Sequence, residues 1–71
     1  MKKNDYKISL QAARVNAKLT QNDVCKALHI SKTTVVKWEK DNYVNEITLI
    51  ALCSLYNVPD KSYIFLDKKC N

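Results

Sequence analysis

The sequence predicts an all-α domain, because apolar residues recur at helical spacing in four segments and a polar capping residue precedes three of them. The expected helices span residues 9–17, 20–28, 32–40 and 46–56, and a short last turn follows at 60–63. The 71 residues suffice for one domain. A core of this size contributes a net stability of about 3–5 kcal/mol and leaves little room for an enclosed catalytic cavity.

The first expected helix begins after Ser9, whose hydroxyl can cap it. The residues that recur on its buried face are Leu10, Ala13, Arg14 and Ala17. It ends near residues 16–18 without the glycine that commonly closes a helix.

The second helix opens at Thr20, whose hydroxyl can accept from the amide of Asp23 while Asp23 reaches back, which gives a weak capping box. Its buried face is expected to consist of Val24, Cys25 and Leu28. His29 follows, and we interpret it as a turn residue in the left-handed conformation, which histidine tolerates. A metal or catalytic role is disfavoured because no second ligand lies near it.

Ser31 caps the third helix, and i, i+3 spacing places Val35 and Trp38 on one inward face together with Ile30. The side chains that project away from this face belong to Lys32, Thr33, Val36 and Lys37, with Thr34 beside them.

Residues 41–45 form a turn-prone linker to the fourth helix. Its buried stripe is expected to contain Leu49, Leu52, Cys53 and Tyr56, with Ile47 and Ile50 partly off it. Pro59 blocks continuation of the helix, and Asp60 can cap the last turn.

Residues 64–66 either close the core or form an extended segment, and for Phe65 we favour the core. Residues 1–7 are expected to be a flexible arm and residues 67–71 a polar tail.

The charge balance points to a polyanionic partner. Twelve Lys and Arg against seven Asp and Glu give a net charge of +5, and the resulting positive field concentrates polyanions. Nucleic acid is the first partner to consider and an anionic membrane surface is the second. No apolar run of about 18 residues and no signal-like segment occurs, so we expect a cytoplasmic protein that does not enter a membrane.

Composition also argues against an enzyme or a metalloprotein. Cys25, Cys53 and Cys70 are widely spaced and His29 is the single histidine, which does not make a zinc site. Cys25 and Cys53 are expected to be buried, and Cys70 to be an exposed free thiol. The absence of glycine excludes a glycine-rich phosphate loop. We therefore predict no cofactor, no metal and no catalytic activity.

Residues 19–39 have the sequence form of a helix-turn-helix, in which the second helix of the pair enters the DNA major groove. Lysine can donate to guanine, threonine can bond several bases, and the methyl groups of Thr33 or Val36 can contact thymine. The alternative for Val36 is that it overlaps the edge of the core. RNA binding is disfavoured, because the aromatic residues do not gather on a stacking platform.

Three further residues are candidates for phosphate contacts. Gln21 begins the second helix, where unpaired N–H groups and the positive dipole end converge. Lys40 and Asn42 follow the base-facing part of the third helix and could meet the DNA backbone. The alternatives are an ordinary exposed glutamine and a solvated turn.

Together these residues resemble the Cro/repressor-type (XRE-like) helix-turn-helix family, with matches over roughly residues 8–66. The matching segments are Ala13-Arg14, Leu19-Thr20-Gln21, Val24-Cys25, Leu28-His29-Ile30-Ser31, Thr34-Val35-Val36-Lys37-Trp38-Glu39 and Tyr56-Asn57-Val58. The resemblance implies a compact, lambda-repressor-like bundle of four to five helices. It also implies that Lys32, Thr33 and Lys37 read bases, that Gln21 meets a phosphate, and that Arg14 and Glu39 form a structural pair.

The sequence departs from the family where glycine is usual, with Lys18, His29 and Asp41 (or Lys40) at those positions. A left-handed residue other than glycine costs about 1 kcal/mol or more, so the turns should survive at a cost. A Tyr-x-Val segment followed by Ile-Phe-Leu resembles small regulators of Gram-positive phages and mobile elements.

The function expected from the sequence is that of a double-stranded DNA-binding transcriptional regulator, a repressor of phage or mobile-element genes. Two copies on half-sites about one helical turn apart would give tight binding, with Ile47, Ile50 or residues 64–66 at a homodimer contact. The alternative is an antirepressor-like or antitoxin-like protein-interaction module on the same fold.

Overall fold

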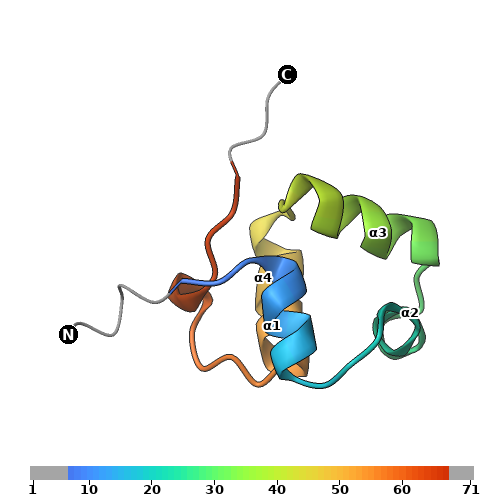
Figure 1. The fold of residues 1–71 in the computed structure, drawn as a ribbon, viewed down its shortest axis with the longest axis horizontal. Coiled ribbons are helices and arrows are strands. Elements are labelled where there is room, and N and C mark those ends of the chain that lie inside the picture. The colour runs from blue at the N-terminus through green and yellow to red at the C-terminus, as the bar shows by residue number, and fades with distance from the viewer. Residues whose placement is uncertain (1–6, 68–71) are drawn as a thin grey trace.

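The computed structural model describes residues 7–67, which form an all-helical domain (Figure 1). The elements are α1 (Leu10–Asn16), α2 (Gln21–Leu28), α3 (Lys32–Asp41), α4 (Glu46–Leu55) and the 3-10 helix η2 (Lys61–Tyr63). α3 packs against both α2 and α1, and η2 packs against α4. The predicted fold class is therefore confirmed, with boundaries that differ from the expected ones by about one residue.

Polar side chains cap every helix, and all of these caps except Asn45 are predicted from the sequence. Ser9 accepts from the amide of Ala12 at the start of α1, and Thr20 and Asp23 form the reciprocal capping box of α2. The remaining caps are Ser31 for α3, Asn45 for α4 and Asp60 for η2. Because each cap satisfies an otherwise unpaired amide, these residues fix where the short helices begin.

Four residues other than glycine take the left-handed conformation among the described residues: Lys18, His29, Asn42 and Asn57. The interpretation of His29 as a left-handed turn residue is confirmed (φ 58°). The expectation that Asp41 or Lys40 would occupy this conformation at the end of the third helix is wrong, because α3 continues through Asp41 and Asn42 adopts it (φ 51°). Asparagine is, after glycine, the residue found in the left-handed position directly after a helix, which fits the extension of α3 by one residue.

The core joins all four helices and the C-terminal segment. Its buried residues are Leu10, Ala13, Val24, Val35, Val44, Leu49, Leu52, Cys53, Tyr56 and Ile64. The whole predicted stripe of α4 is buried, whereas Cys25, expected to be buried, is only partly so and packs at the core edge. Ile47 and Ile50 lie off the stripe and are exposed.

Residues 64–66 form an extended segment that pairs with the chain before α1. Ile8 and Ile64 make a parallel bridge, in which the Ile8 amide donates to the Tyr63 carbonyl and the Phe65 amide donates to the Ile8 carbonyl. Ile64 is buried, but Phe65 is 43% exposed. The expectation that Phe65 completes the core is therefore wrong, because successive side chains of an extended segment point to opposite sides.

Some predictions concern residues outside the described range. The exposed thiol expected at Cys70 lies there, as do residues 1–6 of the expected arm and residues 68–71 of the expected tail.

Candidate nucleic-acid interface

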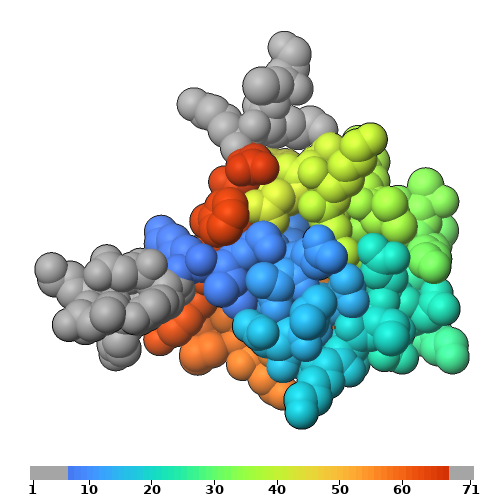
Figure 2. All heavy atoms as spheres, in the orientation of Figure 1, coloured from blue at the N-terminus to red at the C-terminus, as the bar shows by residue number. Residues whose placement is uncertain are grey.

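α2 and α3 lie together at one end of the molecule (Figures 1 and 2). The turn between them depends on His29, whose left-handed backbone lets the Ile30 amide donate to the Cys25 carbonyl at 3.1 Å. Val24 of α2 and Val35 of α3 are fully buried against the core. The two helices are thus held as one unit, which fixes the direction of α3.

An ion pair anchors the inner side of α3 to α1. Arg14 Nε lies 2.6 Å from Glu39 Oε2, and its Nη2 donates to Glu39 Oε1 at 3.2 Å. Arg14 Nη1 also donates to the Leu19 carbonyl at 2.8 Å, just before α2. Both side chains are about nine-tenths buried, and the hydrogen bond from Glu39 raises the pKa of Arg14. The Arg14–Glu39 pair expected from the sequence is present, and it also reaches the start of α2.

Gln21 joins the same network. Its side-chain amide donates to Glu39 Oε1 at 3.0 Å, across 18 positions of sequence, and the residue is half-buried at the first position of α2. One N–H of an amide NH₂ group is used by this bond, which leaves the second N–H for another acceptor. Glu39 therefore positions both α1 and the first residue of α2 relative to α3.

The outer face of α3 is exposed to solvent. Lys32, Thr33, Val36 and Lys37 are all exposed, and Val36 does not belong to the core cluster. Lys37 Nζ lies 3.0 Å from Asp41 Oδ2 across one helical turn, but both side chains face solvent. Such an exposed pair contributes little stability, so Lys37 can exchange this partner for another at low cost.

The remaining predicted contact residues lie in different settings. Thr34 is half-buried, and its hydroxyl lies 3.0 Å from that of the capping residue Ser31. Lys40 is exposed near the end of α3. Asn42 is buried, since its side-chain oxygen accepts from the Leu10 amide at 2.9 Å and its NH₂ group donates to the Phe65 carbonyl at 3.1 Å. Asn42 therefore connects the end of α3 to the start of α1 and to the C-terminal segment. Its side chain is not available to DNA in this structure.

Sequence reasoning missed the roles of Asn42 and of the Gln21–Glu39 bond. A left-handed asparagine directly after a helix was a usable signal for the first, because asparagine is favoured at that position. No local pattern signals the second, because the two residues meet only after α2 and α3 have packed.

Within residues 7–67, no group of three or more His, Cys, Asp and Glu side chains is arranged to hold a metal ion. No helix in the same range is long and apolar enough to cross a bilayer.

Residues 10–61 match a family model described as helix-turn-helix. The match spans most of the chain and includes α1 to α4, so the protein belongs to the helix-turn-helix family of the Cro/XRE type. It is a DNA-binding transcription regulator of that type, and the family is not one of enzymes. Searches among curated proteins and among solved structures found no match.

Proposed function

We propose that the protein binds one DNA sequence specifically, as a repressor, with the outer face of α3 in the major groove. The observation that carries this proposal is the contrast on α3: one side is anchored through Val35 and Glu39, while the opposite side presents exposed side chains without a fixed structural role. A helix held rigidly on one side is suited to reading base edges with the other.

Lys32, Thr33 and Lys37 are proposed to make polar contacts with bases, and Val36 to contact a thymine methyl group. The chemistry fits, because lysine donates to guanine O6 and N7, and threonine bonds several bases. Val36 is 41% exposed, so its isopropyl group has apolar surface that a thymine methyl could cover. Thr34 lies beside these residues and completes the proposed surface.

Gln21 and Lys40 are proposed to contact phosphates. Gln21 lies at the N-terminus of α2, and its bond to Glu39 leaves one N–H for a phosphate oxygen. Lys40 is exposed and adds charge without sequence information. Asn42 is not part of the proposed surface, since its side chain is bonded within the domain.

We further propose that two copies bind inverted half-sites through contacts between their α4 helices. Ile47 and Ile50 lie one turn apart on α4 and are 82% and 54% exposed. Residues 42–45 join the end of α3 directly to α4, so contact through Ile47 would bring the ends of the two α3 helices near the two-fold axis. Covering two isoleucines buries little area, which favours a dimer that forms on DNA.

The first experiment is a binding selection from randomised duplex DNA at near-physiological salt, followed by sequencing. An enriched motif establishes sequence specificity, and two inverted copies of it establish dimeric binding. Recovery of unenriched DNA would contradict the proposal and favour a protein-interaction module instead.

Charge-reversal variants of the lysines on α3 test whether this helix carries the DNA binding. The double variant Lys32→Glu/Lys37→Glu should abolish binding of the selected duplex, because two donors become like charges facing phosphates. Lys7→Glu is the control for each single reversal, Lys32→Glu or Lys37→Glu, because it makes the same change of charge at an exposed lysine before α1. Equal losses in the three single variants would show that only net charge matters.

The proposed dimer is tested by sedimentation with and without the selected duplex. Ile47→Asp should reduce the complex to one copy per duplex, whereas Glu46→Gln, at the adjacent exposed position, should retain two. Two copies bound in the Ile47→Asp variant would exclude α4 as the contact.

The repressor role and the phage or mobile-element origin are proposed on the resemblance of the Tyr56-x-Val58 segment and residues 64–66 to such regulators. Such a protein would act inside a bacterial cell, where its operator lies. A reporter downstream of the selected operator should lose expression when the protein is present. Increased expression would identify an activator.

A further inference from the structure

Two β-branched side chains, Thr33 and Val36, occupy the middle of the outer face of α3. They are three positions apart, so they are neighbours on one side of the helix, with about 5–6 Å between their Cβ atoms. Lys32 and Lys37 flank them along the chain, and all four residues are exposed. The outer face of α3 therefore combines methyl groups at its centre with an ammonium group on either side.

Val36 is suited to recognise a methyl group on a base. Its isopropyl group forms no hydrogen bonds, and the residue is 41% exposed. The core takes Val35 from this helix, with Trp38 packed against it, and does not include Val36. An exposed apolar side chain gains free energy when other apolar surface covers it. In the major groove the C5-methyl group of thymine offers such a surface, so Val36 responds to that methyl group and not to the polar groups of the base.

Thr33 does not distinguish the polar groups at ring position 4 of a pyrimidine. Its exposed hydroxyl is not hydrogen-bonded to any residue from 7 to 67, whereas the hydroxyl of Thr34 lies 3.0 Å from that of Ser31. A hydroxyl both donates and accepts, so it can bond either to O4 of thymine or to the N4 amino group of cytosine. The methyl group of Thr33 adds to the apolar surface of Val36. Both side chains therefore respond to the methyl group at C5 more than to the identity of the pyrimidine.

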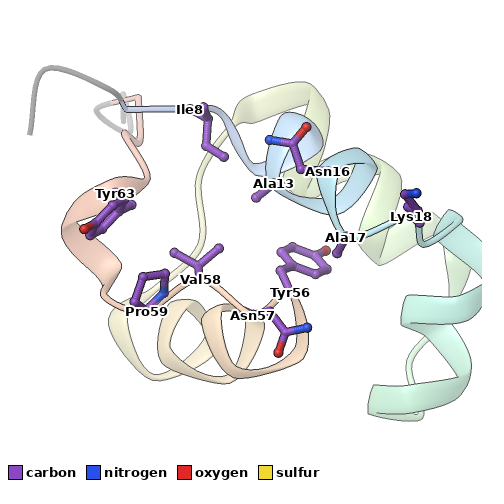
Figure 3. A pocket seen from close by; sticks show the side chains of 10 residues that line it. All are labelled: Ile8, Ala13, Asn16, Ala17, Lys18, Tyr56, Asn57, Val58, Pro59 and Tyr63. Carbon is purple, nitrogen blue, oxygen red and sulfur yellow. The ribbon is translucent and has the colours of Figure 1, made fainter. Parts of the chain in front are cut away.

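The methyl contact belongs on this surface and not in a hollow of the domain. The hollow between α1, the end of α4 and η2 has a volume of about 500 Å³ and a mainly apolar lining (Figure 3). None of the described residues that line it comes from α3. A base that stays paired presents its C5-methyl group in the major groove, which admits an α-helix. Recognition of the methyl group by α3 therefore depends on Thr33 and Val36.

We propose that Thr33 and Val36 select a C5-methylated pyrimidine, so that 5-methylcytosine is accepted where the preferred sequence carries thymine. This inference rests on the proposed function, because it requires the outer face of α3 to enter the major groove. In that groove, thymine and 5-methylcytosine present the same methyl group and differ in the group at position 4. Methylation of a cytosine at this position therefore strengthens binding of the protein.

The test is fluorescence anisotropy with the duplex obtained from the binding selection. Each thymine of the half-site is replaced in turn by uracil, which lacks the C5-methyl group and keeps the polar groups. At one thymine, uracil should weaken binding about fourfold, the effect of one covered methyl group. At the same position, 5-methylcytosine paired with guanine should bind about fourfold more tightly than cytosine paired with guanine. Each comparison changes only the methyl group, so the effect of the altered base pair cancels.

Variants of α3 assign the methyl effect to the two side chains. Val36→Ala should lower both affinity ratios, and Thr33→Ser, which keeps the hydroxyl and loses the methyl group, should lower them in part. The double variant should bring both ratios close to one. Val15→Ala is the matched control, because it makes the same substitution at a valine of α1 that is 55% exposed, and it should retain both ratios. Thermal unfolding shows that each variant is folded.

The outcomes separate this proposal from the proposed function. A selected motif without thymine, or one in which uracil is tolerated at every thymine, would overturn methyl recognition and leave sequence-specific binding intact. The same holds if the methyl effect persists in the double variant, or if it occurs for thymine and not for 5-methylcytosine. A selection that enriches no motif would contradict the proposed function itself.

Discussion

The two sides of α3 differ in how many bonds fix them. On the inner side, Glu39 accepts from Arg14 and Gln21, and Asn42 bonds to the chain at Leu10 and Phe65. On the outer side, Lys32, Thr33 and Val36 have no fixed partner that shapes the fold, and Lys37 pairs only with Asp41 in solvent. The inner side therefore carries stability and orientation, while the outer side is left for recognition.

This separation has a physical reason. A side chain that bonds three elements cannot be changed without cost to the fold, whereas an exposed side chain changes stability by only a few tenths of a kcal/mol. Members of such a family can thus change the outer side and acquire a new operator on the same scaffold. Substitutions on the two sides of α3 should accordingly differ in which property they alter.

The largest expected effect is that of Arg14→Ala. It leaves the Glu39 carboxylate nearly buried and without its cation, and it removes the bond to the Leu19 carbonyl. The free energy of unfolding should fall by about 3 kcal/mol, a large part of the total for so small a domain. Urea unfolding measures this change. Arg14→Lys keeps the charge but not the two-pronged geometry, and it should give an intermediate loss. Unchanged unfolding with lost DNA binding would contradict the structural role of the pair.

Asn42→Ala should have the next largest effect, about 2–3 kcal/mol. It leaves the Leu10 amide and the Phe65 carbonyl without their partners and places alanine in the left-handed conformation. Asn42→Gly is the matched control, because it removes the same bonds but tolerates the backbone. The difference between the two variants should be about 1 kcal/mol. Equal stabilities would show that the backbone conformation contributes nothing here.

Lys37→Ala tests the outer side. It should leave unfolding by urea nearly unchanged, because its bond to Asp41 is exposed. On the selected DNA sequence we expect a loss of about 1–3 kcal/mol in binding, together with relaxed preference at one base pair. Competition binding with single-base variants of the duplex measures both effects. Equal weakening on every sequence would make Lys37 a phosphate contact, and a large loss of stability would contradict the distinction between the two sides.

The smallest effect concerns the turn that joins α2 and α3. His29→Gly should raise the free energy of unfolding by about 1 kcal/mol, since glycine adopts the left-handed conformation without steric cost. Ala27→Gly, at an exposed position inside α2, is the control and should lower it by a similar amount. DNA affinity should change in neither variant. A destabilised His29→Gly variant would show that the histidine side chain makes a contribution beyond its backbone.

Much of the architecture could be predicted from local sequence. Ser9, Thr20 and Ser31 mark helix starts because a capping residue acts on amides within three positions of itself. The stripe of α4 follows from the helical period alone, and His29 could be interpreted as a turn residue from its position after Leu28. These inferences succeed because the residues that interact lie close together in the sequence.

The tertiary structure alone decided the features that join distant segments. Phe65 and Ile64 are adjacent and both apolar, and only the pairing with Ile8 determines which of them is buried. Asn42 is bonded across 32 and 23 positions of sequence, and Gln21 across 18. The sequence by itself determined the helices, all their caps except Asn45, and the exposed side of α3, because these depend on local geometry and periodicity. The network that orients α3 exists only once the helices have packed, because its partners share no local pattern.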